Sequence, residues 1–108
     1  MTVYEESPFE KVGRLYLDGD GLVIRSDLDT RGFSVPLVDV AAVLAGEPQA
    51  VRLLATGVVV GMAGLSASGK AMNFWIDPVL YTAPISRVMD VLEGGARKAA
   101  VFTGRERV

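Results

Sequence analysis

A chain of 108 residues that is 50% hydrophobic and 22% charged is expected to fold as a single domain, residues 1–108, around one core. It contains no cysteine and no histidine, which excludes disulfides, thiolate metal sites and the commonest general base. The net charge of −2 does not indicate a nucleic-acid partner. Residues 1–11 lack the apolar run of a secretory signal, so we expect a cytoplasmic protein with a loosely ordered N-terminal segment.

The first half of the chain carries clear turn signals. The β-prone runs 12–17 and 22–25 flank "DGDG" at 18–21, a pattern that predicts a hairpin. A second turn is expected at 27–32. The stretch 37–46 fits a helix with one apolar face, but it fits a buried strand after a turn at Pro36 equally well.

The two turns also contain the aspartates that could serve a small ligand-binding or carboxylate-based enzymatic barrel. These candidates are Asp18, Asp20, Asp27 and Asp29. "DLDTRG" at 27–32 resembles the start of a calcium loop, yet Arg31 and Val38 stand at two of the positions where oxygen ligands are needed. We therefore favour solvated turns and expect no bound metal.

An uncharged tract spans residues 53–69. Its valines and glycines favour buried strands joined by tight turns. As a helix, its 17 residues would rise only about 25 Å, less than the bilayer core, so we expect no membrane span. The next stretch, "KAMNFWI" at 70–76, alternates as a strand does and places Phe74 and Trp75 on opposite faces.

Residues 64–70, "GLSASGK", have the outline of a phosphate-binding loop. However, Ala71 stands where such a loop has its magnesium-binding serine or threonine. The loop also needs a helix after it to supply amide donors, and a strand pattern follows here instead. We interpret the stretch as a hairpin loop and expect no nucleotide or other cofactor.

The clearest helix pattern covers residues 83–93. Thr82 is a plausible N-cap, Pro84 falls in the first turn, and Gly94 stands one residue past the end. The helix has one apolar stripe that should face the core. Together with two residues of the preceding strand, this stripe forms the set of core or interface candidates: Phe74, Trp75, Ile85, Val88, Met89 and Leu92. A final strand is expected at 97–102.

The chain also aligns with itself. Residues 12–46 match 60–94 without gaps and with ten identities. A duplicated unit would explain this. A chain rich in valine and glycine also aligns with itself by chance, and we favour that second interpretation.

Residues 13–46 resemble the opening of a pleckstrin-homology-like domain, in which an extended hairpin leads into a segment of the form Val35-Pro36-Leu37 running on to Val40 and Val43. More particularly, this stretch is similar to the archaeal taxis adaptor family CheF, which links the flagellar motor to chemotaxis proteins. The helix 83–93, followed by glycines and a short strand, fits the same comparison. The resemblance implies an adaptor role.

The predicted fold is α+β: a small, strongly bent antiparallel β-barrel or split sheet of about seven strands, with the helix 83–93 plugging one open side. The chain has more apolar residues than one small core can hide. We therefore expect a non-catalytic protein-interaction or adaptor module that forms homo-oligomers, rather than an enzyme.

Overall fold

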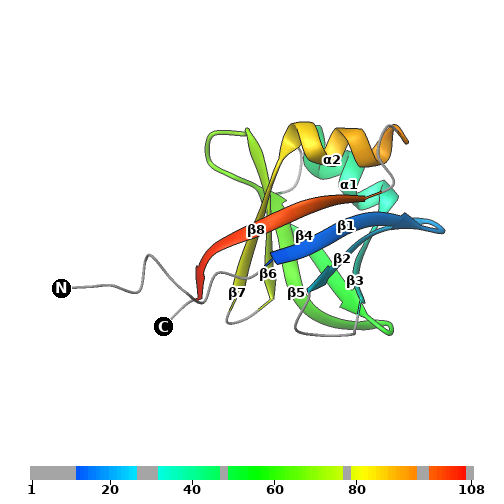
Figure 1. Cartoon of the computed structure of the whole chain (residues 1–108). Helices are drawn as coiled ribbons and strands as arrows, with labels where there is room; N and C mark the ends of the chain where they lie inside the picture. Colours follow the sequence, from blue (N-terminus) through cyan, green and yellow to red (C-terminus); the bar gives the residue numbers. More distant parts are fainter. Residues whose placement is uncertain (1–11, 27–31, 47–48, 77–78, 95–97, 107–108) are drawn as a thin grey trace.

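The computed structural model describes residues 12–26, 32–46, 49–76, 79–94 and 98–106; the expectations for 1–11 and for most of the turn at 27–32 lie outside them. Eight antiparallel strands follow one another around a closed barrel, in which β8 returns to pair with β1 (Figure 1). The strands are β1 (Val12–Asp18), β2 (Gly21–Ser26), β3 (Gly32–Pro36), β4 (Val51–Ala55), β5 (Val58–Leu65), β6 (Ala71–Ile76), β7 (Val79–Pro84) and β8 (Lys98–Glu106). The predicted antiparallel barrel is confirmed, with eight strands where about seven were expected. Because only two short helices accompany it, the fold is mostly β and the α+β label holds only roughly.

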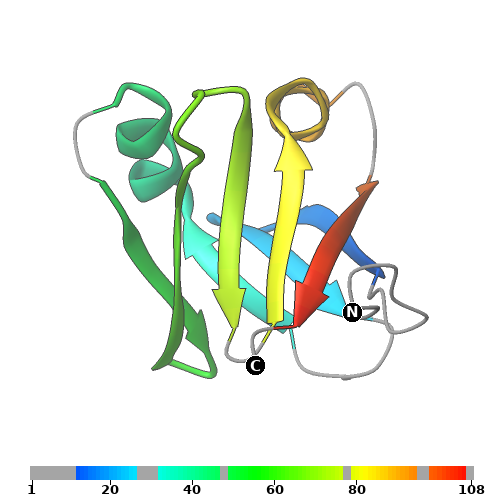
Figure 2. The same cartoon turned by 90° about the vertical axis from the view of Figure 1, so that its left-hand side faces the viewer.

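Two helices, α1 (Leu37–Leu44) and α2 (Ile85–Leu92), lie at the same end of the barrel, on either side of the β5–β6 hairpin (Figure 2). Each helix begins directly after a strand that ends in proline, and each is followed by a glycine at positive φ, +81° at Gly46 and +77° at Gly94. Of the two alternatives for 37–46, the helix is therefore correct. The expectation of one late helix is corrected to two.

The two halves of the chain are copies of one β-β-β-α-β unit. The first copy comprises β1 to β4 with α1, and the second comprises β5 to β8 with α2. The pairings β3–β4 and β4–β5 have the same register as β7–β8 and β8–β1 when 48 is added to or subtracted from each residue number. Two examples are Ser34↔Leu54 with Thr82↔Phe102, and Val51↔Ala63 with Ala99↔Leu15. The self-alignment therefore reflects a structural repeat, and the interpretation as chance is wrong.

The repeat is not gapless, because the two hairpins differ in length. Leu17 pairs with Leu22 across the first hairpin, and Leu65 pairs with Met72 across the second, whose loop is two residues longer. The structural equivalent of Gly21 is therefore Ala71 rather than Gly69. A shorter connection between β6 and β7 restores the offset of 48 before the helices.

The same hairpins hold the helix N-termini. The Leu37 amide donates a hydrogen bond to the Asp20 carbonyl at 2.8 Å, and the Ile85 amide donates to the Lys70 carbonyl at 3.0 Å. Each bond satisfies one of the amides that a helix N-terminus leaves without an intrahelical acceptor. Backbone contacts of the same kind thus fix both helices over the barrel end.

The start of α2 differs from the sequence prediction. The helix runs from Ile85 to Leu92, and its N-cap is Pro84, without a side-chain capping bond. Thr82 lies in β7 instead, where its hydroxyl donates a hydrogen bond to Asn73 Oδ1 at 3.0 Å. The fully buried residues of α2 are Val88 and Val91.

The barrel interior is filled by side chains from both halves. Aliphatic and aromatic residues from β1 to β7 point inward and meet the buried faces of the two helices. The largest fully buried side chains are Phe74, Leu15, Leu22, Ile24, Leu53, Met72, Val35, Val40, Val43, Val88 and Val91. Within the described part of the chain, no buried polar side-chain atom lacks a hydrogen-bond partner. Over the described residues, the interior is thus built from packed apolar side chains.

Candidate interaction surface

The two candidate aspartates that the structure describes do not line a pocket. Asp18 and Asp20 are both exposed at the β1–β2 hairpin. Asp27 and Asp29 lie outside the described residues. Over the ranges that the structure describes, no group of three or more His, Cys, Asp or Glu side chains could hold a metal ion.

The segment 64–70 forms the hairpin expected from its sequence. Gly64 lies in β5, which ends at Leu65, and β6 begins at Ala71 without an intervening helix. The Ser66 amide donates to the Ala71 carbonyl at 2.9 Å, and the Gly69 amide donates to the Ser66 carbonyl at 2.9 Å. Gly69 has a φ of +75°, which its missing side chain permits. The hairpin interpretation is confirmed.

An apolar surface crosses the outside of the barrel from β4 to β7. Side chains alternate between the core and the outside along each strand, so residues paired across strands share a face. The outward members are joined by the pairs Leu54↔Val59, Met62↔Trp75 and Trp75↔Leu80. We call these five residues the outer apolar patch: Leu54, Val59, Met62, Trp75 and Leu80. Val59 is 50% exposed and Met62 is 39% exposed, and the other three are partly buried.

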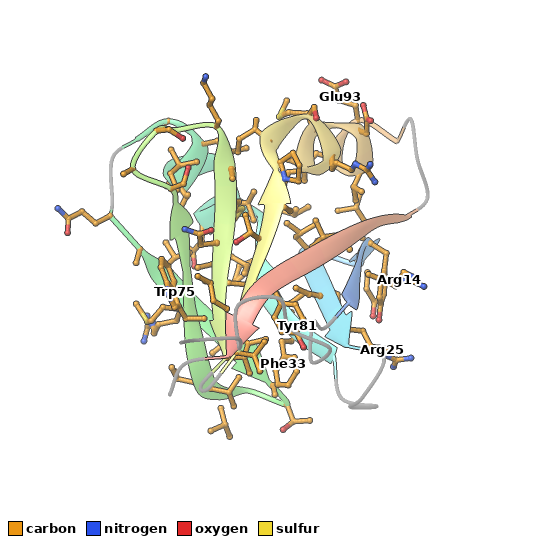
Figure 3. The ribbon with its side chains drawn as sticks, turned by 60° about the vertical axis from the view of Figure 1, so that its left-hand side comes forward. Arg14, Arg25, Phe33, Trp75, Tyr81 and Glu93 are labelled. Atoms are coloured by element: carbon orange, nitrogen blue, oxygen red, sulfur yellow. The ribbon has the colours of Figure 1, made fainter. Side chains whose placement is uncertain are left out.

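The equivalent surface of the first half is basic. Arg14 and Arg25 face each other across β1 and β2, at the positions that Met62 and Trp75 occupy in the second half. Figure 3 shows the two arginines on the opposite side of the molecule from Trp75. Like charges directly opposite one another destabilise a sheet. Since the same backbone carries such different outer surfaces, the needs of the fold do not explain either one.

The six core or interface candidates separate into three groups. Phe74 and Val88 are fully buried in the core. Ile85 and Leu92 pack against the core while partly exposed, and Met89 is partly buried on α2. Trp75, the sixth core or interface candidate, lies on the outer face and belongs to the patch.

Four patch residues were missed by the sequence analysis: Leu54, Val59, Met62 and Leu80. Three of them lie in the uncharged tract 53–69, whose composition favours buried strands joined by tight turns and gives no sign of an exposed face. The exposed Arg52 was the available signal, because it precedes Leu54 by two residues and therefore marks the outer face of β4.

Comparison with known proteins found no matching family model, no matching curated protein and no matching solved structure. In the residues that the structure describes, neither helix has the length and apolar character needed to cross a membrane.

Proposed function

We propose that this chain is a non-catalytic protein-interaction module that associates with a second copy of itself through the outer apolar patch. The patch carries this proposal, because Met62, Trp75 and Leu80 form one row of paired residues across β5 to β7. Leu54 and Val59 form a second apolar pair on β4 and β5, with Arg52 opposite Met62. Contiguous exposed apolar surface on a small protein marks an interaction site, and Trp and Met are enriched at protein interfaces. The filled interior gives the alternative, a ligand-binding or enzymatic barrel, no comparable support.

The adaptor role belongs to this proposal as well. It is implied by the resemblance of residues 13–46 to pleckstrin-homology-like and CheF-like proteins. The basic surface around Arg14 and Arg25 would leave a second face available for another protein once the apolar patch is covered. A cytoplasmic location suits such a module.

Sedimentation velocity over a range of concentrations tests the self-association. We expect the wild-type chain to dimerise and Met62→Lys to raise the dimer dissociation constant about tenfold or more, because a charged ammonium must then be desolvated at the interface. Met62 is 39% exposed, so the barrel itself should tolerate the lysine.

Val38→Lys is the matched control for that variant. Val38 is 77% exposed on α1, away from the patch, so the same change of chemistry should leave the dissociation constant unaltered. A wild-type chain that stays monomeric at every concentration, or equal effects of the two lysines, would contradict the proposal.

A further inference from the structure

The turn between β4 and β5 holds a residue that is poorly suited to its conformation. Thr56 has a φ of +49° and Gly57 a φ of +83°, so both central residues of this two-residue hairpin have positive φ, as in a type I′ turn. Within the described ranges, Thr56 is the only residue other than glycine with positive φ. A β-branched residue is strained there, although its hydroxyl donates a hydrogen bond to the Ala55 carbonyl at 2.6 Å.

The same turn leaves apolar side chains in water. Val58 is 61% exposed and Val59 is 50% exposed at the start of β5. Threonine and valine both favour extended backbone. Straightening residues 56–59 would therefore relieve the strain at Thr56, and the pairs that Val58 and Val59 make with β4 could form with β4 of another chain.

The turn also joins the two repeated units. The units meet at two seams, β4 against β5 and β8 against β1, and these seams have equivalent registers. Apart from the covalent link at the turn, the pairs in both seams form equally well between units of different chains. A second copy of this chain supplies every one of the required partners.

We propose that self-association occurs by exchange of these units. The β4–β5 turn opens, and β1–β4 of one chain closes a barrel with β5–β8 of its partner. Exchange of identical elements is a low-cost route to a dimer, and short strained hinges favour it. This inference rests on the proposed self-association and specifies its geometry. The outer apolar patch begins beside the hinge, where Leu54 pairs with Val59, so in the exchanged dimer this pair joins the two chains and each patch is shared between them.

A disulfide across the second seam distinguishes exchange from association of closed barrels. The natural chain has no cysteine, so a pair introduced as Arg14→Cys and Ala100→Cys has no competing thiol. These positions are opposite each other between β1 and β8, as a disulfide requires. After oxidation of the dimer fraction, we expect a covalent dimer on a denaturing, non-reducing gel.

The pair Arg14→Cys and Arg25→Cys is the control. It shares one substitution with the test pair, but both positions lie in the same unit, opposite each other on β1 and β2. Its disulfide should stay within one chain, so this variant should run as a monomer on the denaturing gel.

Each other outcome has a definite meaning. If the native chain dimerises while the seam disulfide stays within one chain, exchange is overturned and association through the patch survives. If the native chain is monomeric at all concentrations, both proposals are overturned.

Substitution at the hinge gives a second test in the chain without cysteine. Thr56→Asn introduces the Asn-Gly pair preferred by type I′ turns, which stabilises the closed monomer relative to the exchanged dimer. The dimer dissociation constant should therefore rise about tenfold or more. Thr56→Val keeps the β-branched strain and should leave the dimer at least as stable. Equal dissociation constants for the two variants, measured by sedimentation after refolding at high concentration, would overturn the exchange.

Discussion

Gly61→Ala should lower the free energy of unfolding by about 3 kcal/mol, because a side chain at this position has no room. Gly61 lies in β5 beside a bulge, where the β4–β5 register shifts between Leu53 and Leu54. A Cβ atom there would fall on the backbone oxygen of Trp75 in β6. Since backbone cannot swing aside as a side chain can, the sheet itself must deform. Urea unfolding followed by circular dichroism measures the loss.

Gly21→Ala is the matched control for this prediction. A Cβ at Gly21 would meet the Ser34 Cβ and the Val35 carbonyl oxygen at 3.6 Å, which is ordinary van der Waals contact. Its φ lies outside the positive region, so alanine fits and should change the free energy of unfolding by less than about 1 kcal/mol. Similar losses for the two variants would contradict the close approach at Gly61.

Phe74→Ala should cost about 3–5 kcal/mol of unfolding free energy, because it removes a large side chain from the centre of the barrel. Phe74 is 1% exposed and is the largest of the fully buried side chains. The surrounding strands are held by pairing on both sides of β6, so they can close only part of the cavity. Thermal unfolding should show a correspondingly large fall in Tm.

The neighbouring residue provides the contrast. Trp75 is larger than Phe74 but lies outside the barrel between Met62 and Leu80, so Trp75→Ala should cost about 1 kcal/mol, the scale of lost cross-strand pairs. The same variant should weaken self-association. A loss of stability equal to that of Phe74→Ala would show that Trp75 belongs to the core after all.

Local turn chemistry explains why much of the fold could be predicted. The aspartate and glycine cluster at 18–21, the loop at 66–70 and the glycine at 94 each specify a backbone conformation within a few residues. Such signals do not depend on the rest of the chain. The hairpins and the end of α2 therefore appeared where they were expected.

Features that depend on closure of the barrel could not be predicted. The alternation in β6 separates Phe74 from Trp75, but it does not say which of the two faces is the inside. The direction in which the sheet curves to close the barrel determines the inner face, and it places Trp75 on the outside. The helix at 37–44 was undecided for a related reason, since its apolar periodicity gains meaning only against the barrel end that buries Val40 and Val43.

The repeat was hidden by two compensating differences in length. The extra residues in the second hairpin shift β6 relative to β2, and the shorter connection before β7 reverses that shift. An alignment without gaps therefore matches β1, β3 and α1 correctly while misplacing β2. The identities alone were too few, in a chain so rich in valine and glycine, to outweigh chance.

The order of strands around the barrel has a consequence for how the chain folds. Each strand pairs with the next one in sequence, and one further pairing, between β8 and β1, closes the barrel. Contacts between sequence neighbours form quickly, because little chain entropy is lost in bringing them together. The entropic cost of long-range closure is thus concentrated in a single late event, the zipping of the last strand onto the first.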